Sequence, residues 1–332
     1  MAFRYSAEGV KMIRKLMPMK RYALLVLAGV AIMTGCATTY HPGAPKGAID
    51  VIAHRGASAY APENTLVSFK RAKEMRADWF ELDCTLTKDG QVVVIHDDTV
   101  DRVTNGNGRV AEMTLAELKG LDAGAKKDPK FAGERLPALA EALDLAKAEQ
   151  IGVYIEIKNC NDDTNLIKDV TAMAEGHQRL SPKMWRRMTS MIEKSRTRNL
   201  ELTEKAIELV RKRKMTRQVV IQSFSPIICM IAMDRAPRIR TELLGSKDKD
   251  DPDRWPMYLR CIELIDPPGF NTNPDSFDEQ LLKTCHAEGR TMAVWTIDDE
   301  AEMRRFASLG VDAIITDKPD VCLEVLKAMG KR

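Results

Sequence analysis

Two acidic side chains and two histidines stand where short apolar runs of this sequence end. Glu81 and Asp83 are two residues apart in one run, so an extended chain points both to the same face. His54 and His96 each end another run. Two carboxylates this close are costly unless they share a cation or a proton, and a histidine exchanges a proton near neutral pH. These residue types indicate proton transfer beside a bound metal ion.

A third carboxylate and two cations extend this set. Glu156 and Lys158 repeat the spacing of two at the end of a later run, and Arg55 directly follows His54. Three carboxylates without clustered cysteines favour a hard cation with oxygen ligands, Ca²⁺ or Mg²⁺ ahead of Mn²⁺. Arg55 offers a bidentate fork, and Lys158 a point charge, to a bound phosphate. Together these groups predict phosphoryl transfer from an ester.

Such residues need a scaffold that brings several strand ends together. Short β-rich runs are predicted at residues 50–54, 79–83, 92–96, 153–156, 219–222, 239–244, 292–295 and 313–316. Helices with apolar residues at i, i+3 and i+4 are predicted at residues 64–75, 139–149, 202–214, 278–288, 299–308 and 321–329. This alternation predicts an α/β protein with a (β/α)8 barrel, in which the carboxyl ends of the strands form the active face.

Two features depart from a regular barrel. Only residues 84–91 separate the second and third runs, a length typical of a hairpin and short for a parallel crossover. Long insertions, 97–136 and 159–216, follow the third and fourth runs, and we expect both to be walls or lids of a substrate pocket. Within the second, the basic stretch 183–217 either covers the pocket, contacts anionic lipid or forms a solvated helix.

The motifs occur in an order that resembles the glycerophosphodiester phosphodiesterases. The match runs from about residue 51 to residue 319 and comprises His54-Arg55-Gly56, Pro62-Glu63-Asn64-Thr65, Glu81-Leu82-Asp83, Lys88-Asp89-Gly90, His96-Asp97, Glu156-Ile157-Lys158, Trp295-Thr296 and the run from Gly310 to Asp317. The resemblance implies a distorted (β/α)8 TIM barrel of the phospholipase C-like phosphodiesterase type, in which the short second connection is normal. It also implies hydrolysis of glycerophosphodiesters, such as glycerophosphocholine, to sn-glycerol 3-phosphate and an alcohol.

The same resemblance implies ligands of one divalent cation, an acid and base pair, and contacts to phosphate. The implied metal ligands are Glu81, Asp83 and Glu156, and the implied acid–base pair is His54 and His96. The implied phosphate contacts are Arg55 and Lys158. Gln222 and Trp295 end later runs and are expected to line the glycerol pocket, with the barrel core as the alternative place for Trp295. Glu63 either caps the helix after Pro62 or supports the ligands from behind.

Two other functions are compatible with this site. The enzyme would hydrolyse lysophospholipids, in the manner of a lysophospholipase D, if the basic insertion contacts lipid. Alternatively, the chain is a binding lipoprotein on an inherited barrel, although the complete set of two histidines and three carboxylates argues against that function.

The first 35 residues are typical of a lipoprotein signal peptide. They hold six Lys or Arg and one acidic residue, a net charge of +5, which leaves 45 basic and 47 acidic residues, a net of −2, for the rest. The body therefore indicates no nucleic-acid partner, and no protein partner is evident. An apolar run at 22–33, too short to span a bilayer comfortably, leads to Met33-Thr34-Gly35-Cys36, which resembles a bacterial lipobox.

The signal peptide sets the expected domain order and location. We expect a lipid on Cys36, a tether over residues 36–48 and a barrel domain over residues 49–332. Ordinary signal cleavage or an uncleaved anchor is the alternative to lipidation. The expected protein is exported, and its lipid anchor holds it on a membrane facing the periplasm or the cell surface.

Overall fold

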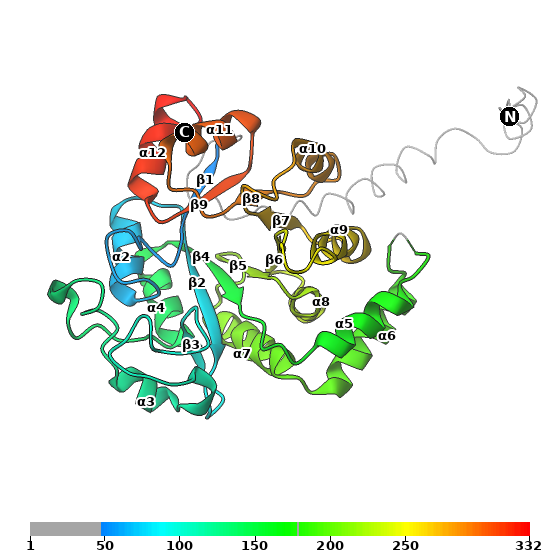
Figure 1. Cartoon of the computed structure of the whole chain (residues 1–332), viewed down its shortest axis with the longest axis horizontal. Helices are drawn as coiled ribbons and strands as arrows, with labels where there is room; N and C mark the ends of the chain where they lie inside the picture. Colours follow the sequence, from blue (N-terminus) through cyan, green and yellow to red (C-terminus); the bar gives the residue numbers. More distant parts are fainter. Residues whose placement is uncertain (1–47, 178) are drawn as a thin grey trace, which may run out of the picture. The chain divides into compact units, whose positions relative to one another are not determined.

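The computed structural model describes residues 48–177 and 179–332 (Figure 1). Cys36, the predicted signal peptide and all but the last residue of the predicted tether lie outside these residues. Eight parallel strands close a barrel in the order β1 (Asp50–Ala53), β2 (Trp79–Leu86), β4 (Gly152–Ile157), β5 (Val219–Ser223), β6 (Arg240–Gly245), β7 (Gly269–Thr272), β8 (Ala293–Val294) and β9 (Ala313–Thr316). The ring closes because β1 pairs with both β2 and β9. The predicted (β/α)8 barrel is confirmed.

Helices surround the strands and fill the connections between them (Figure 1). They are α2 (Leu66–Glu74), α3 (Leu115–Gly120), α4 (Leu139–Glu149), α5 (Thr164–Met173), α6 (Pro182–Ser195), α7 (Arg198–Lys212), α8 (Pro226–Arg235), α9 (Arg254–Ile265), α10 (Glu279–Ala287), α11 (Glu300–Leu309) and α12 (Pro319–Ala328), with short 3-10 turns η1 (Val110–Glu112) and η2 (Pro129–Phe131). Among the described residues, no helix is both long enough and apolar enough to cross a membrane.

One predicted barrel strand is wrong, and another was missed. The third run forms β3 (Val92–Val94), which pairs antiparallel with β2 outside the barrel. The short connection is therefore a hairpin, as its length alone indicated. The missing barrel strand is β7, whose sequence Gly-Phe-Asn-Thr has a single large apolar residue and gives little β signal. Helix α8 was missed because it is apolar on nearly every side and has no polar face to mark a helical period.

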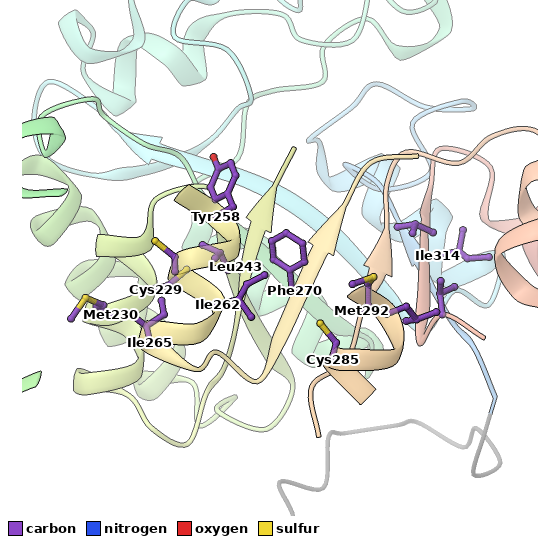
Figure 2. Packing of buried hydrophobic residues seen from close by; sticks show 14 of the residues in the cluster. Cys229, Met230, Leu243, Tyr258, Ile262, Ile265, Phe270, Cys285, Met292 and Ile314 are labelled. Carbon is purple, nitrogen blue, oxygen red and sulfur yellow. The ribbon is translucent and has the colours of Figure 1, made fainter. Parts of the chain in front are cut away.

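Alternation along the strands separates two apolar layers. One face of the strands fills the barrel interior with Ile52, Trp79, Tyr154, Val220, Ala293, Ala313 and Ile315. The other face packs against the helices, and Figure 2 shows strand residues Leu243 and Phe270 near Ile262 and Ile265 of α9. Because the strand period is two, interior positions further along each strand continue toward the active face of the barrel.

The two insertions fold differently from one another. Residues 97–136 cover a separate small core that includes Val93, Ile95 and Leu118. In the second insertion, α6 buries Met188 and Ile192, and the Trp185 indole donates to Asp234 of α8 over 3.0 Å. The basic stretch thus includes a packed amphipathic helix, with its lysines and arginines on the outer side.

A glycine in β4 makes room for the largest side chain of the barrel interior. Gly152 pairs in register with Trp79, and a Cβ there would lie 2.1 Å from the Trp79 ring. We expect Gly152→Ala to lower the free energy of unfolding by about 1–3 kcal/mol, because overpacking forces the strand or the ring to shift. Urea unfolding followed by circular dichroism measures the change. Gly120→Ala is the control, since nothing lies within 4 Å of a Cβ at Gly120; equal stability of the two variants would contradict the prediction.

Candidate active site

A cavity of about 180 Å³ opens where the barrel strands end. It is lined by His54, Arg55, Glu81, His96, Glu156, Lys158, Gln222, Phe224, Leu244, Trp295, Thr296 and Ile315. Most of the predicted site residues therefore meet at one place. Asp83 is buried beside this cavity and Glu63 lies behind Arg55. Neither long insertion contributes a lining residue to this cavity, so the insertions are not its walls; their expected role as lids stays a prediction.

The three predicted metal ligands converge because of strand period and register. Glu81 and Asp83 continue the interior face of β2 that begins at Trp79, and Asp83 pairs in register with Glu156 of β4. One oxygen of each carboxylate lies within 4.8 Å of an oxygen of the others. Glu81 and Asp83 are each 1% exposed and Glu156 is 9% exposed, so three acidic groups share a nearly dry space.

This donor set fits a hard divalent cation. Burial, and then the charge of Asp83, raises the pKa of Glu81 to about 8. Outer oxygens are already fixed by the protein: the Arg55 backbone N–H donates to Glu81 over 2.9 Å, and the Asn64 amide donates to Asp83 over 2.8 Å. Such supporting bonds orient carboxylates toward an ion.

Asn64 and Glu63 do not cap the following helix. Thr65 is the N-cap of α2, and it exchanges hydrogen bonds with Ser68. Asn64 instead has a positive φ of 58°, and its side chain faces Asp83. Glu63 accepts a hydrogen bond from Arg55 over 2.9 Å and contacts no predicted ligand. The capping interpretation of Glu63 is therefore wrong, and it supports Arg55.

Each histidine is held by its own carboxylate. His54 Nδ1 lies 2.7 Å from Asp317 Oδ1, and His96 Nδ1 lies 2.6 Å from Asp97 Oδ1. A carboxylate accepts hydrogen bonds, so each Nδ1 carries a proton and each ring keeps Nε2 for the cavity. Burial lowers the pKa of His54, but the hydrogen bond to Asp317 and the charge of Glu81 outweigh it and leave the pKa raised.

The two predicted phosphate contacts line the cavity and are paired with carboxylates. Lys158 Nζ lies 2.8 Å from Glu156 and 3.5 Å from Asp83. Arg55 Nε lies 3.2 Å from Asp83, and its other end bonds Glu63. Burial raises the pKa of Asp83, yet the charges of Lys158 and Arg55 outweigh that effect and lower it. The cations thus balance part of the carboxylate charge.

Gln222 and Trp295 form the far wall. Gln222 pairs in register with Glu156, and its side-chain oxygen accepts from Asn271 over 3.2 Å. Trp295 packs on the interior layer of the barrel and also lines the cavity, so both of its predicted places apply. Its ring meets Phe224 edge to face at 5.5 Å. The indole N–H is buried without a partner among the described residues.

Sequence reasoning missed the groups that hold these side chains. Asp97 and Asp317 lie inside motifs that were noted, but no role was predicted for them. The sequence offers one signal for each: Asp97 directly follows a histidine, and Asp317 directly follows a strand. Phe224 and Leu244 follow or end strands and gave no signal beyond being apolar. Arg102, discussed below, gave none.

A barrel that gathers buried carboxylates, oriented histidines and cations at its strand ends is typical of enzymes that hydrolyse phosphate esters. Comparison with known proteins makes the class specific. The glycerophosphoryl diester phosphodiesterase family matches residues 54–321, and the chain belongs to this family. The resemblance and the enzyme class predicted from the sequence are thereby confirmed.

Relatives and solved structures agree over most of the chain. A glycerophosphodiester phosphodiesterase of Caldanaerobacter subterraneus is 37% identical over 281 residues, which are 84% of this chain and 98% of that protein. One of Bacillus subtilis is 31% identical over 287 residues, covering 83% and 86%. A phosphodiesterase of Oleispira antarctica, solved with the product sn-glycerol-3-phosphate, superposes with a TM-score of 0.67 at 26% identity and covers 85% of this chain and 98% of its own.

The bond between Asp317 and His54 predicts a pH effect. Asp317 raises the pKa of His54, so Asp317→Asn is expected to lower that pKa. The limb of the pH–rate profile that belongs to His54 then moves to lower pH, whether His54 acts as the acid or as the base, and kcat falls about 10- to 100-fold. Asp312→Asn, which removes the carboxylate 2.9 Å from the exposed His286, should leave the limb in place. An unmoved limb in Asp317→Asn would contradict the prediction.

Proposed function

We propose that this enzyme hydrolyses glycerophosphodiesters, such as glycerophosphocholine, to sn-glycerol 3-phosphate and an alcohol. The proposal assigns one divalent cation to Glu81, Asp83 and Glu156, and the acid–base pair to His54 and His96. The observation that carries it is the convergence of three buried carboxylates with two histidines whose Nδ1 atoms are each bound by a carboxylate. Relatives named for this reaction support it.

The residues of the chain divide the chemistry among them. Ca²⁺ or Mg²⁺ bound by the three carboxylates supplies a Lewis acid for the phosphate oxygens and favours a hydroxide nucleophile. Arg55 and Lys158 hold the remaining phosphate charge, Arg55 through two donors and Lys158 as a point charge. Both line the cavity, and the carboxylates that pair with them keep them from turning into solvent.

The histidines move the protons. One Nε2 takes the proton of the attacking hydroxyl, and the other gives a proton to the oxygen of the departing alcohol. Asp317 and Asp97 fix the tautomer of their histidines and stabilise the imidazolium forms. After one hydrolysis the base histidine carries the extra proton and the acid histidine is neutral, so the first releases a proton to water and the second takes one up before the next turnover.

The cavity favours a small substrate over a lysophospholipid. Its volume of about 180 Å³ and its apolar wall of Phe224, Leu244 and Trp295 suit the glycerol unit. The alternative function as a lysophospholipase takes the basic insertion as the contact to lipid. Residues 183–217 do not line the cavity, so they would hold a lipid substrate only outside it.

The proposal predicts four linked results. Purified protein releases sn-glycerol 3-phosphate from glycerophosphocholine, EDTA abolishes the release, and Mg²⁺ or Ca²⁺ restores it. His54→Ala lowers kcat by about 10²- to 10⁴-fold, because proton transfer loses its group. An enzyme-coupled assay of sn-glycerol 3-phosphate measures all four, with circular dichroism as the check on folding.

His286→Ala is the matched control, since His286 is exposed and pairs with Asp312 away from the cavity. It should keep full activity. Activity that survives both EDTA and the loss of His54 would sink the proposed mechanism. Micellar lysophosphatidylcholine, assayed in parallel, would reverse the substrate assignment if it were hydrolysed faster than glycerophosphocholine.

We also propose that the enzyme is exported and carries a lipid on Cys36, on the evidence of the sequence alone. Expressed in bacteria from the full sequence with radioactive palmitate, the wild type should take up label and sediment with membranes. Cys36→Ser should lose both properties, because acyl chains are what holds the protein to the bilayer. Label or membrane association that persists in Cys36→Ser would contradict lipidation of this residue.

A further inference from the structure

We propose that Arg102 is a positioning residue that holds His96 and Arg55 in one mutual arrangement. It acts through the two carboxylates that bind them, Asp97 and Glu63. The proposal rests on the proposed function, since it takes His96 as one of the proton-transfer groups and Arg55 as a phosphate contact.

The guanidinium of Arg102 has two carboxylates, one on each side. Toward Asp97, Nε donates to Oδ2 over 2.6 Å and Nη2 to Oδ1 over 3.2 Å. Toward Glu63, Nη1 donates to Oε2 over 2.7 Å and Nη2 to Oε1 over 2.7 Å. Both contacts are bidentate, so rotation of the guanidinium in either direction breaks hydrogen bonds on both sides.

Each of these carboxylates also contacts an active-site side chain, through the same oxygen that accepts from Arg102 Nη2. Asp97 Oδ1 lies 2.6 Å from His96 Nδ1, and Glu63 Oε1 accepts from Arg55 Nη1 over 2.9 Å. The chain of contacts is continuous from His96 through Arg102 to Arg55. Arg55 in turn lies 3.2 Å from Asp83, so the chain ends at a predicted metal ligand. Arg102 itself does not line the cavity.

This arrangement differs from an ordinary surface ion pair. The side chain of Arg102 is 48% exposed, and single exposed pairs contribute little to stability because solvent screens them. Here one cation joins residues from two separate segments, and both of its partners are committed to active-site side chains. Hydrogen bonds from Arg102 are also the main reason that the pKa of Asp97 is lowered to about 2, so Arg102 stabilises the ionised form that accepts from His96.

The need for such a link follows from the topology. His96 comes from the segment after the β2–β3 hairpin, whereas Arg55 comes from the loop after β1. The strands before these two segments, β1 and β3, do not pair with each other; each of them pairs with β2. A second contact, from Lys127 Nζ to the Ser58 carbonyl over 2.7 Å, ties the same insertion to the same loop. Whereas Lys127 bonds a backbone carbonyl, Arg102 bonds the two carboxylates that hold His96 and Arg55.

The test compares Arg102→Gln with Arg109→Gln. Arg109 lies in the same insertion, but its side chain is 61% exposed and its partner Glu112 is 3.9 Å away. We expect Arg102→Gln to lower kcat for glycerophosphocholine about 10- to 100-fold, since a displacement of about 1 Å at a reacting group has a cost of that size. It should also weaken binding of sn-glycerol 3-phosphate, measured by calorimetry, because Arg55 is released. Arg109→Gln should match the wild type in both.

Double-mutant cycles separate positioning from a general loss of folded enzyme. If Arg102 acts through its carboxylates, adding Arg102→Gln to Asp97→Asn, or to Glu63→Gln, costs much less than the product of the single effects. Arg102→Lys should recover little, because an ammonium cannot bind two carboxylates bidentately. This variant keeps the charge, so it carries the test if Arg102→Gln fails to fold.

The outcomes are distinct. Wild-type turnover of glycerophosphocholine decides the proposed function first, independently of any variant. If the wild type is active, then activity of Arg102→Gln within about twofold of Arg109→Gln, or fully multiplicative losses in both cycles, would overturn the positioning role. A fall in kcat with unchanged binding of sn-glycerol 3-phosphate would overturn the half of the proposal that concerns Arg55.

Discussion

Mutual repulsion of three buried carboxylates is the constraint on which the site depends. Glu81, Asp83 and Glu156 are brought together by β2 and β4 and have almost no water to screen them. Nearby residues supply positive charge or hydrogen bonds in response: Lys158 and Arg55 pair with them, and Asn64 and a backbone N–H fix their outer oxygens. Burial and the charge of Asp83 nevertheless raise the pKa of Glu81, and three carboxylates so placed are the oxygen ligands that a hard divalent cation prefers.

The barrel produces this crowding by simple periodicity. Trp79, Glu81 and Asp83 share one face of β2, so the residue type changes from aromatic to acidic as the strand approaches the active face. Neighbouring strands repeat the change, from Tyr154 to Glu156 and from Val220 to Gln222. The apolar layer beneath anchors the strands, so the acidic residues are held by packing that they do not themselves provide.

How much of the fold and of the site can be predicted depends on how far apart in the sequence the residues that determine each feature lie. The spacing of two between Glu81 and Asp83, and again between Glu156 and Lys158, is local, and it correctly predicted a shared face and a shared site. The hairpin is also a local feature, because the connection of residues 84–91 is short for a parallel crossover. Strand β7 was missed because Gly269–Thr272 is short and half polar, and pairing with its neighbours, not propensity, makes it a strand. The partnership of Arg102 with Glu63 spans 39 residues and has no pattern in the sequence.

Because β3 pairs antiparallel with β2 outside the barrel, the two histidines are attached to different parts of the fold. His54 extends directly from a strand of the closed ring, whereas His96 belongs to a segment that pairs outside the ring and covers a small apolar core of its own. The closure of the barrel therefore does not depend on that segment. A change of length or sequence within residues 97–136 therefore leaves the pairing of the ring intact, but it alters the setting of His96 and, through Arg102 and Glu63, that of Arg55. The fold thus separates the ring that carries the three carboxylates from a surface insertion that adjusts the groups around them.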